Sequence, residues 1–362
     1  MNQNDTIVIN GRFLGRALTG VERYALETVN ALDELIATGD PLVAGRQWVV
    51  LVPPGVKAPQ WKHVQVRICG RGKGNLWEQL WLPLYSHRKM LLNLCNAAPL
   101  LKHRQTVVIH DATTKQVPQA FSAGFRAWYG LMIPWLLKTA DKIATVSRFS
   151  QGEIARTYGT KRRITVVPEG SDHFERVQAD SGILDHHELR ARPYVLGVGS
   201  MAPHKNFATL VSAVRLLKAP NFDVVLAGGA NPRVFGDASA DLPAWIKHVG
   251  YVSEGELKAL YQNAACFVFP SLYEGFGLPP IEAMALGCPV ISSNTASPPE
   301  VCGDAAVYFD PHDAHALART IDATLASEEK LRDLKQAGLA RASLFTWKIA
   351  TKHLLEEVFN TR

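Results

Sequence analysis

Residues 266–293, CFVFPSLYEGFGLPPIEAMALGCPVISS, contain a complete strand, loop, helix and strand. The apolar run CFVFPS predicts a buried strand, and LYEGFGL predicts a glycine-rich loop. PPIEAMALG predicts a helix, because prolines suit a first helical turn and Gly287 suits a helix end. PVISS then starts a second strand. This order of elements is typical of a parallel sheet that is covered by helices.

The same alternation of strands and helices runs along most of the chain. Apolar strands are predicted at 6–10, 48–52, 91–95, 106–110, 142–147 and 163–168, and again at 194–200, 223–229, 245–252, 266–271 and 289–293. The polar residues 171–193 lie between the two series and are predicted to link two domains. We therefore expect an α/β protein with two doubly wound domains, whose ligands bind beyond the carboxyl ends of the strands.

The composition fits such a protein. A chain of 362 residues, of which 47% are hydrophobic, can bury two cores. No signal peptide and no run of 18 apolar residues can be recognised, so we expect a cytoplasmic protein. The five cysteines form no C-x-x-C pair, which argues against a disulfide framework and against a cysteine zinc site.

Charge is distributed unevenly between the two halves. Residues 1–170 carry 22 Lys and Arg against 11 Asp and Glu, whereas residues 171–362 carry 17 against 22. A positive field of this kind attracts nucleic acid, anionic lipid headgroups or a phosphorylated substrate. The alternative is a basic surface that is simply solvated.

Two predicted strand ends of the first half carry candidate residues. In INGRFLGRALTG the glycines, among them Gly20, lead to a helix from Val21 whose N–H groups could bind an anion, or they serve as turn residues. In VVIHDATT, His110 stands at a strand tip, where imidazole can donate to a sugar hydroxyl or transfer a proton. A structural role for this histidine is the alternative.

Two strand ends of the second half carry further candidates. In VLGVGSMAPHKN the strand leads through Gly199 and Ser200 to Lys205, whose compact charge suits a diphosphate. The spacing is not that of a nucleoside-triphosphatase P-loop. In the opening stretch, Glu274 precedes the glycine turn and Glu282 lies about one turn into the helix, so the two carboxylates could contact one ligand. Alternatively, Glu274 is a turn residue and Glu282 a favourable charge near a helix start.

With these motifs in view, the chain resembles the retaining glycosyltransferases of family 4, and among them bacterial polysaccharide mannosyltransferases. The resemblance rests on INGRFLGRALTGVERYA, WEQLWLPL, HDAT, TVSRFSQGEI, VVPEG, GVGSMAPHKN, VGYVSEGELKALYQNA, the Glu-x7-Glu stretch and PPEVCGDAAVYFDP. It implies the GT-B fold, in which two Rossmann-like domains face each other across a cleft. It also implies a sugar-nucleotide donor, and no metal or other cofactor.

The resemblance assigns roles to individual residues. Lys205 would neutralise the donor diphosphate, Glu282 would accept hydrogen bonds from the donor ribose, and Glu274 would bind the transferred sugar. His110 and Glu274 are the implied catalytic residues. The implied donor-binding residues are Gly20, Gly199, Ser200, Lys205, Tyr251, Gly275, Phe276, Gly277, Leu278 and Glu282. The chain departs from the family at His204 and Ser200, where related enzymes carry an arginine at one position or the other.

The resemblance also implies a division of labour. Residues 1–173 would bind the acceptor, residues 174–345 the nucleotide sugar, and the helix 346–362 would pack back on the first domain. Mannose from GDP-mannose would pass with retention to a glycan or a lipid-diphosphate-linked acceptor in polysaccharide, O-antigen or lipopolysaccharide synthesis. UDP- and dTDP-linked sugars are alternative donors, and a sugar-nucleotide epimerase or a non-catalytic subunit is an alternative function.

The basic first half has an expected use in this interpretation. It would receive the acceptor and bind an anionic membrane surface peripherally, whereas no recognisable module points to nucleic acid. The apolar positions 77, 80, 81 and 84 fit one face of a helix. We expect that face to belong to the core rather than to a membrane anchor.

Overall fold

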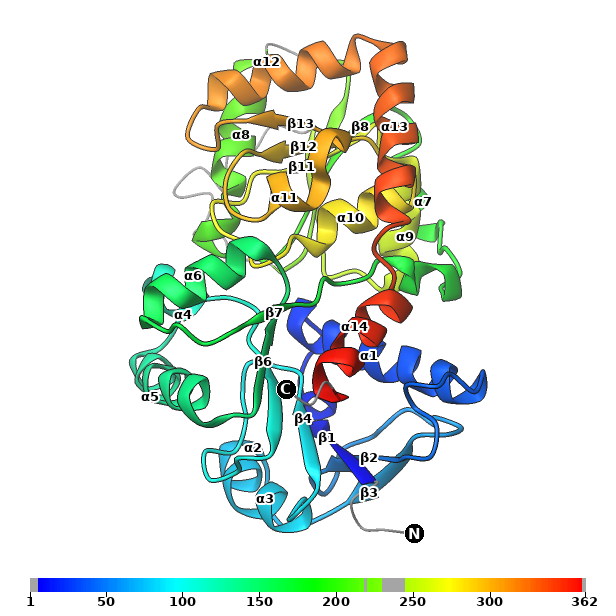
Figure 1. Cartoon of the computed structure of the whole chain (residues 1–362). Coiled ribbons are helices and arrows are strands. Elements are labelled where there is room, and N and C mark those ends of the chain that lie inside the picture. The colour runs from blue at the N-terminus through cyan, green and yellow to red at the C-terminus, as the bar shows by residue number, and fades with distance from the viewer. Residues whose placement is uncertain (1–5, 218–219, 230–244, 360–362) are drawn as a thin grey trace. The chain divides into compact units, whose positions relative to one another are not determined.

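The fold is taken from a computed structural model that describes residues 6–217, 220–229 and 245–359. It divides into two compact units, Met1–Gly170 with Trp347–Arg362, and Ser171–Thr346 (Figure 1). The predicted domain limits, 173/174 and 345/346, lie within three residues of these boundaries. No helix in the described part of the chain is both long enough and apolar enough to cross a bilayer.

The first unit contains a parallel sheet of seven strands within its described residues, in the order β3-β2-β1-β4-β5-β6-β7. The strands are β1 (Thr6–Asn10), β2 (Gln47–Val52), β3 (Gln65–Ile68), β4 (Met90–Asn93), β5 (Gln105–Val108), β6 (Lys142–Thr145) and β7 (Thr165–Val166). Six of them lie where strands were predicted. Edge strand β3 was not predicted, because all four of its residues are exposed and form no buried apolar run.

Helices cover both faces of this sheet. They are α1 (Gly20–Ala37), α2 (Gly74–Leu76), α3 (Leu82–Tyr85), α4 (Thr113–Gln116), α5 (Ala123–Thr139), α6 (Arg148–Tyr158) and α14 (Trp347–Phe359). Short 3-10 turns lie at η2 (Gly11–Gly15) and η4 (Pro118–Ala120), and a π-helical turn, η3 (Trp77–Trp81), joins α2 to α3. Helix α5 packs on Val107 and Ile143 of the sheet, and Trp77 and Leu82 pack on Val8 of the same face.

Helix α14 lies beside α1 in the first unit (Figure 1). The ring of Trp347 meets the ring of Tyr24 edge-on, with 5.9 Å between the centroids. Lys352 Nζ lies 2.7 Å from a carboxylate oxygen of Asp40. These contacts fasten the end of the described chain to its beginning.

The second unit contains a parallel sheet of six strands within its described residues, in the order β10-β9-β8-β11-β12-β13. The strands are β8 (Tyr194–Val198), β9 (Asp223–Ala227), β10 (Ile246–Gly250), β11 (Cys266–Phe269), β12 (Val290–Ser293) and β13 (Ala306–Phe309). Five of them coincide with predicted strands. Strand β13 was not predicted, and its first three residues are only partly buried.

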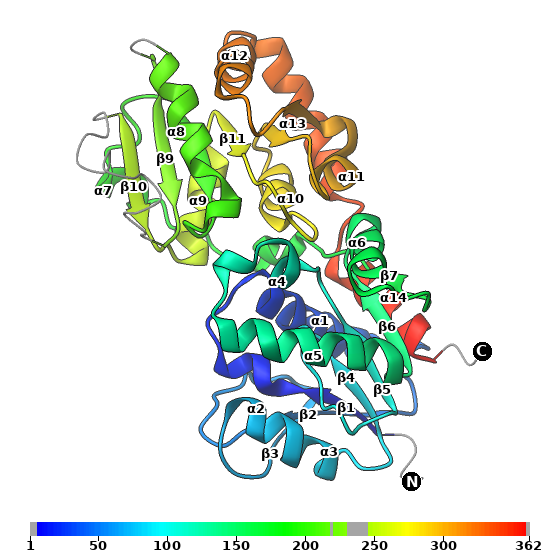
Figure 2. The same ribbon diagram turned by 90° about the vertical axis from the view of Figure 1, so that its left-hand side faces the viewer.

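The helices of the second unit also cover both faces of their sheet (Figure 2). They are α7 (Gly182–His186), α8 (Phe207–Leu216), α9 (Glu254–Asn263), α10 (Leu278–Ala285), α11 (Pro298–Cys302), α12 (Ala314–Leu325) and α13 (Glu328–Ala342). Short 3-10 turns lie at η5 (Asp172–Arg176), η6 (Pro203–Lys205) and η8 (Gly303–Ala305). Helices α8 and α12 share one apolar core with the sheet.

The strand order of each sheet reverses at one point. In the first unit β1 lies between β2 and β4, and in the second unit β8 lies between β9 and β11. Chain connections leave such a pair of strands in opposite directions, which opens a crevice at their carboxyl ends. The loops after β1 and β4, and those after β8 and β11, are therefore the places where each unit can hold a ligand.

The predicted linker, residues 171–193, is an integral part of the second unit. Lys258 of α9 donates to the carbonyl oxygens of Phe174 and Val177, at 2.8 Å each. Phe174 and His173 are each 2% exposed. The stretch follows the boundary between the two units and folds as part of the second one, and its polar composition concealed the buried pair.

Candidate active site

Lys205 and Glu274 meet at the reversal point of the second sheet. Lys205 ends the turn η6 after β8, and Glu274 lies in the loop between β11 and α10. Lys205 Nζ lies 2.6 Å from Glu274 Oε1, and the two side chains are 18% and 14% exposed. An anionic ligand that enters the crevice from solvent can therefore reach the ammonium group in competition with Glu274.

The next residue, Asn206, fixes the position of the Lys205 loop. Its side chain donates to the carbonyl oxygens of Pro270, at 3.0 Å, and Pro311, at 2.8 Å. The backbone N–H of Leu272 donates to the carbonyl oxygen of His204 at 2.8 Å. The loops that follow β8, β11 and β13 are thus tied together, which holds Lys205 in place for a ligand.

Backbone segments pack closely where β8, β9 and β10 end. A Cβ atom on Gly228 would lie 1.9 Å from the carbonyl oxygen of Gly199, so no larger residue fits there. A Cβ atom on Gly229 would lie 2.6 Å from the hydroxyl of Tyr251. Tyr251 as a whole is 88% exposed. The structure thus brings Gly199 and Tyr251 to one edge of the sheet, next to exposed Ser200.

The loop before α10 has the geometry that its glycines predict. Gly277 precedes the helix with φ +96°, a left-handed conformation that disfavours other residues. Phe276 is buried, and its ring meets that of Phe345 edge-on at 5.7 Å. Leu278 begins the predicted helix, and Ser297 Oγ donates to the carbonyl oxygen of Glu274 at 2.9 Å.

Glu282 lies on the inner side of α10 and is 5% exposed. Its Oε1 lies 3.2 Å from Nε2 of His173, and its Oε2 accepts a hydrogen bond from the Tyr261 hydroxyl at 3.3 Å. Neither partner could be recognised from the sequence, because His173 lies in the polar stretch 171–193 and Tyr261 lies in an ordinary amphipathic helix. Both contacts orient a carboxylate that the resemblance assigns to the donor ribose.

His110 follows β5 in the first unit and is 3% exposed. Its Nε2 donates to the carbonyl oxygen of Leu94 at 2.9 Å, and its Nδ1 lies 3.4 Å from Glu169 Oε1. Burial opposes the charged imidazole, but the hydrogen bond and charge of Glu169 outweigh it and raise the pKa of His110. Both ring nitrogens therefore have protein partners, and a role of His110 in transfer stays a prediction.

Gly20 is the first residue of α1. A Cβ atom there would meet no atom of the described chain within 4 Å. Packing therefore does not explain this glycine, and its predicted role beside a diphosphate stays open.

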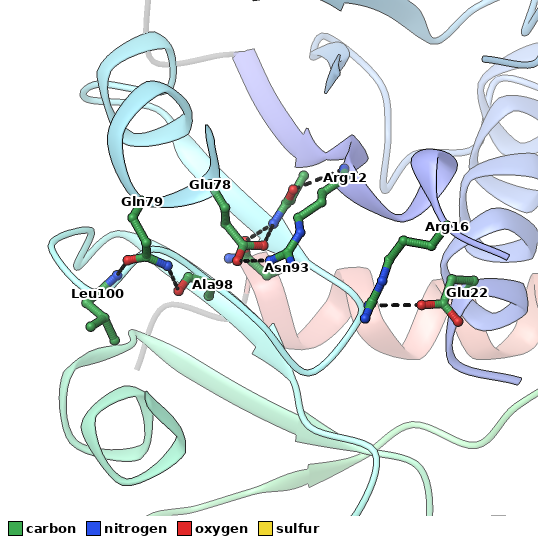
Figure 3. Close-up of polar contacts among 9 residues, drawn as sticks. Arg12, Arg16, Glu22, Glu78, Gln79, Asn93, Ala98 and Leu100 are labelled. Atoms are coloured by element: carbon green, nitrogen blue, oxygen red, sulfur yellow. Dashed lines mark hydrogen bonds and ion pairs between the residues drawn. The ribbon is translucent and has the colours of Figure 1, made fainter. Parts of the chain in front are cut away.

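A buried polar network at the reversal point of the first sheet was not predicted. Glu78, 1% exposed, accepts from Asn10 Nδ2 at 2.9 Å and pairs with the guanidinium of Arg12. Asn10 also donates to Asn93 at 3.0 Å (Figure 3). Asn10 ends β1 and Asn93 ends β4, so this network lies where the fold can hold a ligand. Glu78 belongs to WEQLWLPL, in which no local pattern indicates its partners.

Comparison with known families addresses the second unit directly. The model of the family described as glycosyl transferases group 1 matches residues 185–341, which lie within that unit. The second unit is a glycosyl transferases group 1 domain. The match confirms the predicted glycosyltransferase family for these residues, which are fewer than half of the chain.

Curated relatives of this chain include two proteins whose names refer to O-antigen synthesis. The O-antigen chain mannosyltransferase B of Escherichia coli is 37% identical over 227 residues, which are 59% of either chain. The O-antigen chain mannosyltransferase RfbU of Salmonella typhimurium is 25% identical over 322 residues, which are 85% of this chain and 87% of RfbU. The alignment thus spans less than two thirds of mannosyltransferase B.

Solved structures confirm the fold of the chain. Sucrose-phosphate synthase from Thermosynechococcus elongatus superposes with a TM-score of 0.74 at 21% identity, over 97% of both chains. This likeness, with the two parallel sheets, confirms the predicted GT-B type of α/β fold. The group 1 domain holds Gly199, Lys205, Glu274 and Glu282, whereas His173 lies outside the matched residues.

The pair of His110 and Glu169 predicts a pH-dependent stability. Because the folded-state pKa of His110 is raised above the unfolded value of about 6.5, the pair stabilises the fold fully below that pH. Its contribution to the free energy of unfolding falls as the pH rises through the folded-state pKa. Denaturant unfolding from weakly acidic to alkaline pH should show a steeper loss for the wild type than for His110→Gln. Parallel curves for the two proteins would contradict the pairing.

Proposed function

We propose that the chain transfers mannose from GDP-mannose to a hydroxyl group of a glycan or lipid-diphosphate-linked acceptor in bacterial polysaccharide or O-antigen synthesis. The observation that carries the proposal is the pair of Lys205 and Glu274 at the reversal point of a glycosyl transferases group 1 domain. The names of the two O-antigen mannosyltransferases support mannose as the sugar.

In the proposed reaction, Lys205 compensates the charge of the departing diphosphate. Cleavage of the anomeric bond increases negative charge on the leaving group, so a fixed ammonium and the N–H groups before α10 favour the transition state. When the diphosphate pairs with Lys205 in place of Glu274, the Glu274 carboxylate becomes available to accept hydrogen bonds from the sugar hydroxyls. Glu282, oriented by His173 and Tyr261, accepts hydrogen bonds from the ribose.

We propose that this chemistry needs no metal ion and retains the anomeric configuration. Lys205 and backbone N–H donors supply the charge compensation that a metal would otherwise give. The acceptor hydroxyl attacks from the face that the diphosphate leaves, and a diphosphate oxygen takes the hydroxyl proton. The bond from the anomeric carbon to the acceptor oxygen forms as the bond to the diphosphate oxygen breaks.

The first unit is the proposed acceptor domain. A cavity of about 410 Å³ lies between the turn η2, helix α1 and residues 57–59. Leucine and phenylalanine side chains line it together with Lys57, Arg16 and Glu22, and the last two form an ion pair at 3.0 Å. Apolar walls with two cationic side chains suit a lipid-linked diphosphate, and we propose that the protein reaches it from the cytoplasmic side of the membrane.

Calorimetric titration of GDP, UDP and dTDP, with a chelator present, tests the proposal. We expect GDP to bind at least about tenfold more tightly than the others, a difference of about 1.4 kcal/mol. Tight binding of UDP or dTDP instead would show that the donor is a UDP- or dTDP-linked sugar and not GDP-mannose. A failure of all three nucleotides to bind with the chelator, but binding with Mg²⁺, would overturn the metal-independent mechanism.

The epimerase alternative is tested with GDP-mannose and no acceptor. Glycosyl transfer requires the acceptor, so we expect the sugar nucleotide to remain unchanged apart from slow hydrolysis. The appearance of an epimeric sugar nucleotide would contradict the proposed transfer.

A further inference from the structure

Helices α2 and α3 of the first unit, with the π-helical turn η3 between them, expose a row of leucines. Leu76 is 73% exposed, Leu80 63% and Leu84 64%. Residues four positions apart lie on one side of a helix, so these three leucines form a stripe along 74–85. Large apolar side chains that cluster at a surface indicate an interaction site rather than ordinary exposure.

The π-helical turn explains why the stripe points outward. Leu82 N–H donates to the carbonyl oxygen of Trp77, which adds one residue to the turn. Trp77 and Leu82 are therefore both fully buried, and the ring of Trp81 packs beside them. The prediction that positions 77, 80, 81 and 84 share a core face is thus wrong for Leu80 and Leu84.

Residues 98–104 extend this surface beside the helices. The Gln79 side chain donates to the carbonyl oxygen of Ala98, at 3.0 Å, and accepts from the backbone N–H of Leu100, at 2.9 Å (Figure 3). Lys102 Nζ donates to the carbonyl oxygens of Ser86 and Lys89, at 2.8 and 2.7 Å. Leu101 lies between Leu100 and Lys102, which these hydrogen bonds hold in place, and is 82% exposed.

Helix α5 continues the surface on the other side of this loop. Trp135 Nε1 donates to the carbonyl oxygen of Leu100 at 2.9 Å, and the ring is 44% exposed. Leu131, one turn earlier in α5, is 60% exposed. We call the resulting surface the leucine face, comprising Leu76, Leu80, Leu84, Leu101, Leu131 and Trp135.

Basic residues are frequent in the stretch of chain that carries most of the leucine face. The stretch 67–104 contains seven Lys and Arg against one acidic residue, Glu78, which is buried and paired with Arg12. The exposed basic side chains of this stretch are Arg67, Arg71, Lys73, Arg88 and Arg104. Exposed leucines and exposed cations in one stretch of chain match the interface of an anionic bilayer, where leucines enter the acyl boundary and cations meet phosphates.

We propose that the leucine face docks the first unit on an anionic phospholipid bilayer. Burial of apolar side chains and the attraction of basic residues to anionic lipid both favour such docking. Several such residues on one rigid surface can bind reversibly without a spanning helix. That this docking presents the protein to a lipid-linked acceptor rests on the proposed function, whereas the docking itself does not.

Sedimentation with vesicles of equal parts phosphatidylglycerol and phosphatidylcholine tests the inference at low salt. We expect the wild-type chain to pellet with these vesicles, and the partition of Leu80→Glu/Leu84→Glu to fall by at least about tenfold. The matched control is Leu216→Glu/Leu344→Glu, which alters two exposed leucines of the second unit and should pellet like the wild type. Vesicles of phosphatidylcholine alone should bind less protein.

Nucleotide titration of the same proteins separates this inference from the proposed function. The Leu80/Leu84 variant should bind nucleotide like the wild type, which also shows that it is folded. Wild-type protein that binds nucleotide but does not pellet would overturn the docking and leave the proposed function standing. Protein that pellets but binds no nucleotide would support the docking and overturn the proposed function. If the wild type instead forms a dimer in the absence of vesicles and the Leu80/Leu84 variant does not, the face binds a second copy and the proposal is wrong.

Discussion

Lys205→Ala is expected to weaken the binding of nucleoside diphosphate by about 10- to 100-fold, because a charge-assisted hydrogen bond contributes about 1.5–3 kcal/mol. Turnover with a sugar nucleotide should fall further, by about 100- to 1,000-fold, since the leaving group gains charge in the transition state. Calorimetry measures the first effect, and steady-state kinetics with the acceptor measures the second.

Two variants make the Lys205 experiment specific. Arg332→Ala removes an exposed cation of α13 in the same unit and should bind nucleotide like the wild type. Glu274→Ala removes the partner of Lys205, and we expect turnover to suffer more than nucleotide affinity. Unchanged affinity in Lys205→Ala would remove Lys205 from the site, and a larger affinity loss in Glu274→Ala would reverse the two assignments.

Glu282→Ala is expected to reduce both stability and nucleotide binding. The substitution deletes the carboxylate that faces His173 Nε2 and accepts from Tyr261, and a buried polar group left without its hydrogen-bond partner costs about 1–3 kcal/mol. Nucleotide affinity should fall by at least about tenfold if the carboxylate also binds the ribose. Denaturant unfolding without nucleotide and calorimetric titration measure the two effects separately.

Glu282→Gln distinguishes the two roles of this residue. Glutamine retains an oxygen that can accept from Tyr261 but loses the charge, so the stability loss should be smaller than in Glu282→Ala. Glu329→Gln, at an exposed position of α13, is the control for the loss of one negative charge. An unfolding midpoint of Glu282→Ala equal to that of the wild type would show that the buried contacts are absent in solution.

The sequence predicted the elements of both sheets where the strands are buried. Runs such as 48–52 and 266–269 are apolar because both faces of a parallel sheet are covered, and they are therefore visible in the chain. Strand β3 escaped prediction because it lies at an edge and is exposed. Lys205 and Glu274 were each placed at a strand end, but their ion pair depends on β8 and β11 being neighbours, which sequence order does not reveal.

The partners of buried polar residues were the part that could not be predicted. Glu78 meets Asn10 across 68 positions of the chain, and neither residue carries a local signal of the other. His173 is one histidine in a polar stretch, and only the fold places it against Glu282. Periodicity reports which side of an element is buried, whereas such pairs depend on the tertiary arrangement.

The packing of α14 on α1 has a consequence for biosynthesis. A ribosome makes Trp347–Phe359 after the entire second unit, although this helix belongs to the first unit. Tyr24 and Asp40 therefore lack their partners Trp347 and Lys352 until the whole second unit has been made. Domains tend to fold in the order in which they emerge, and the seven strands of the first sheet are made before those of the second, but the first unit lacks α14 until the second unit has been made. The nascent first unit therefore keeps the part of α1 that meets α14 uncovered during that interval.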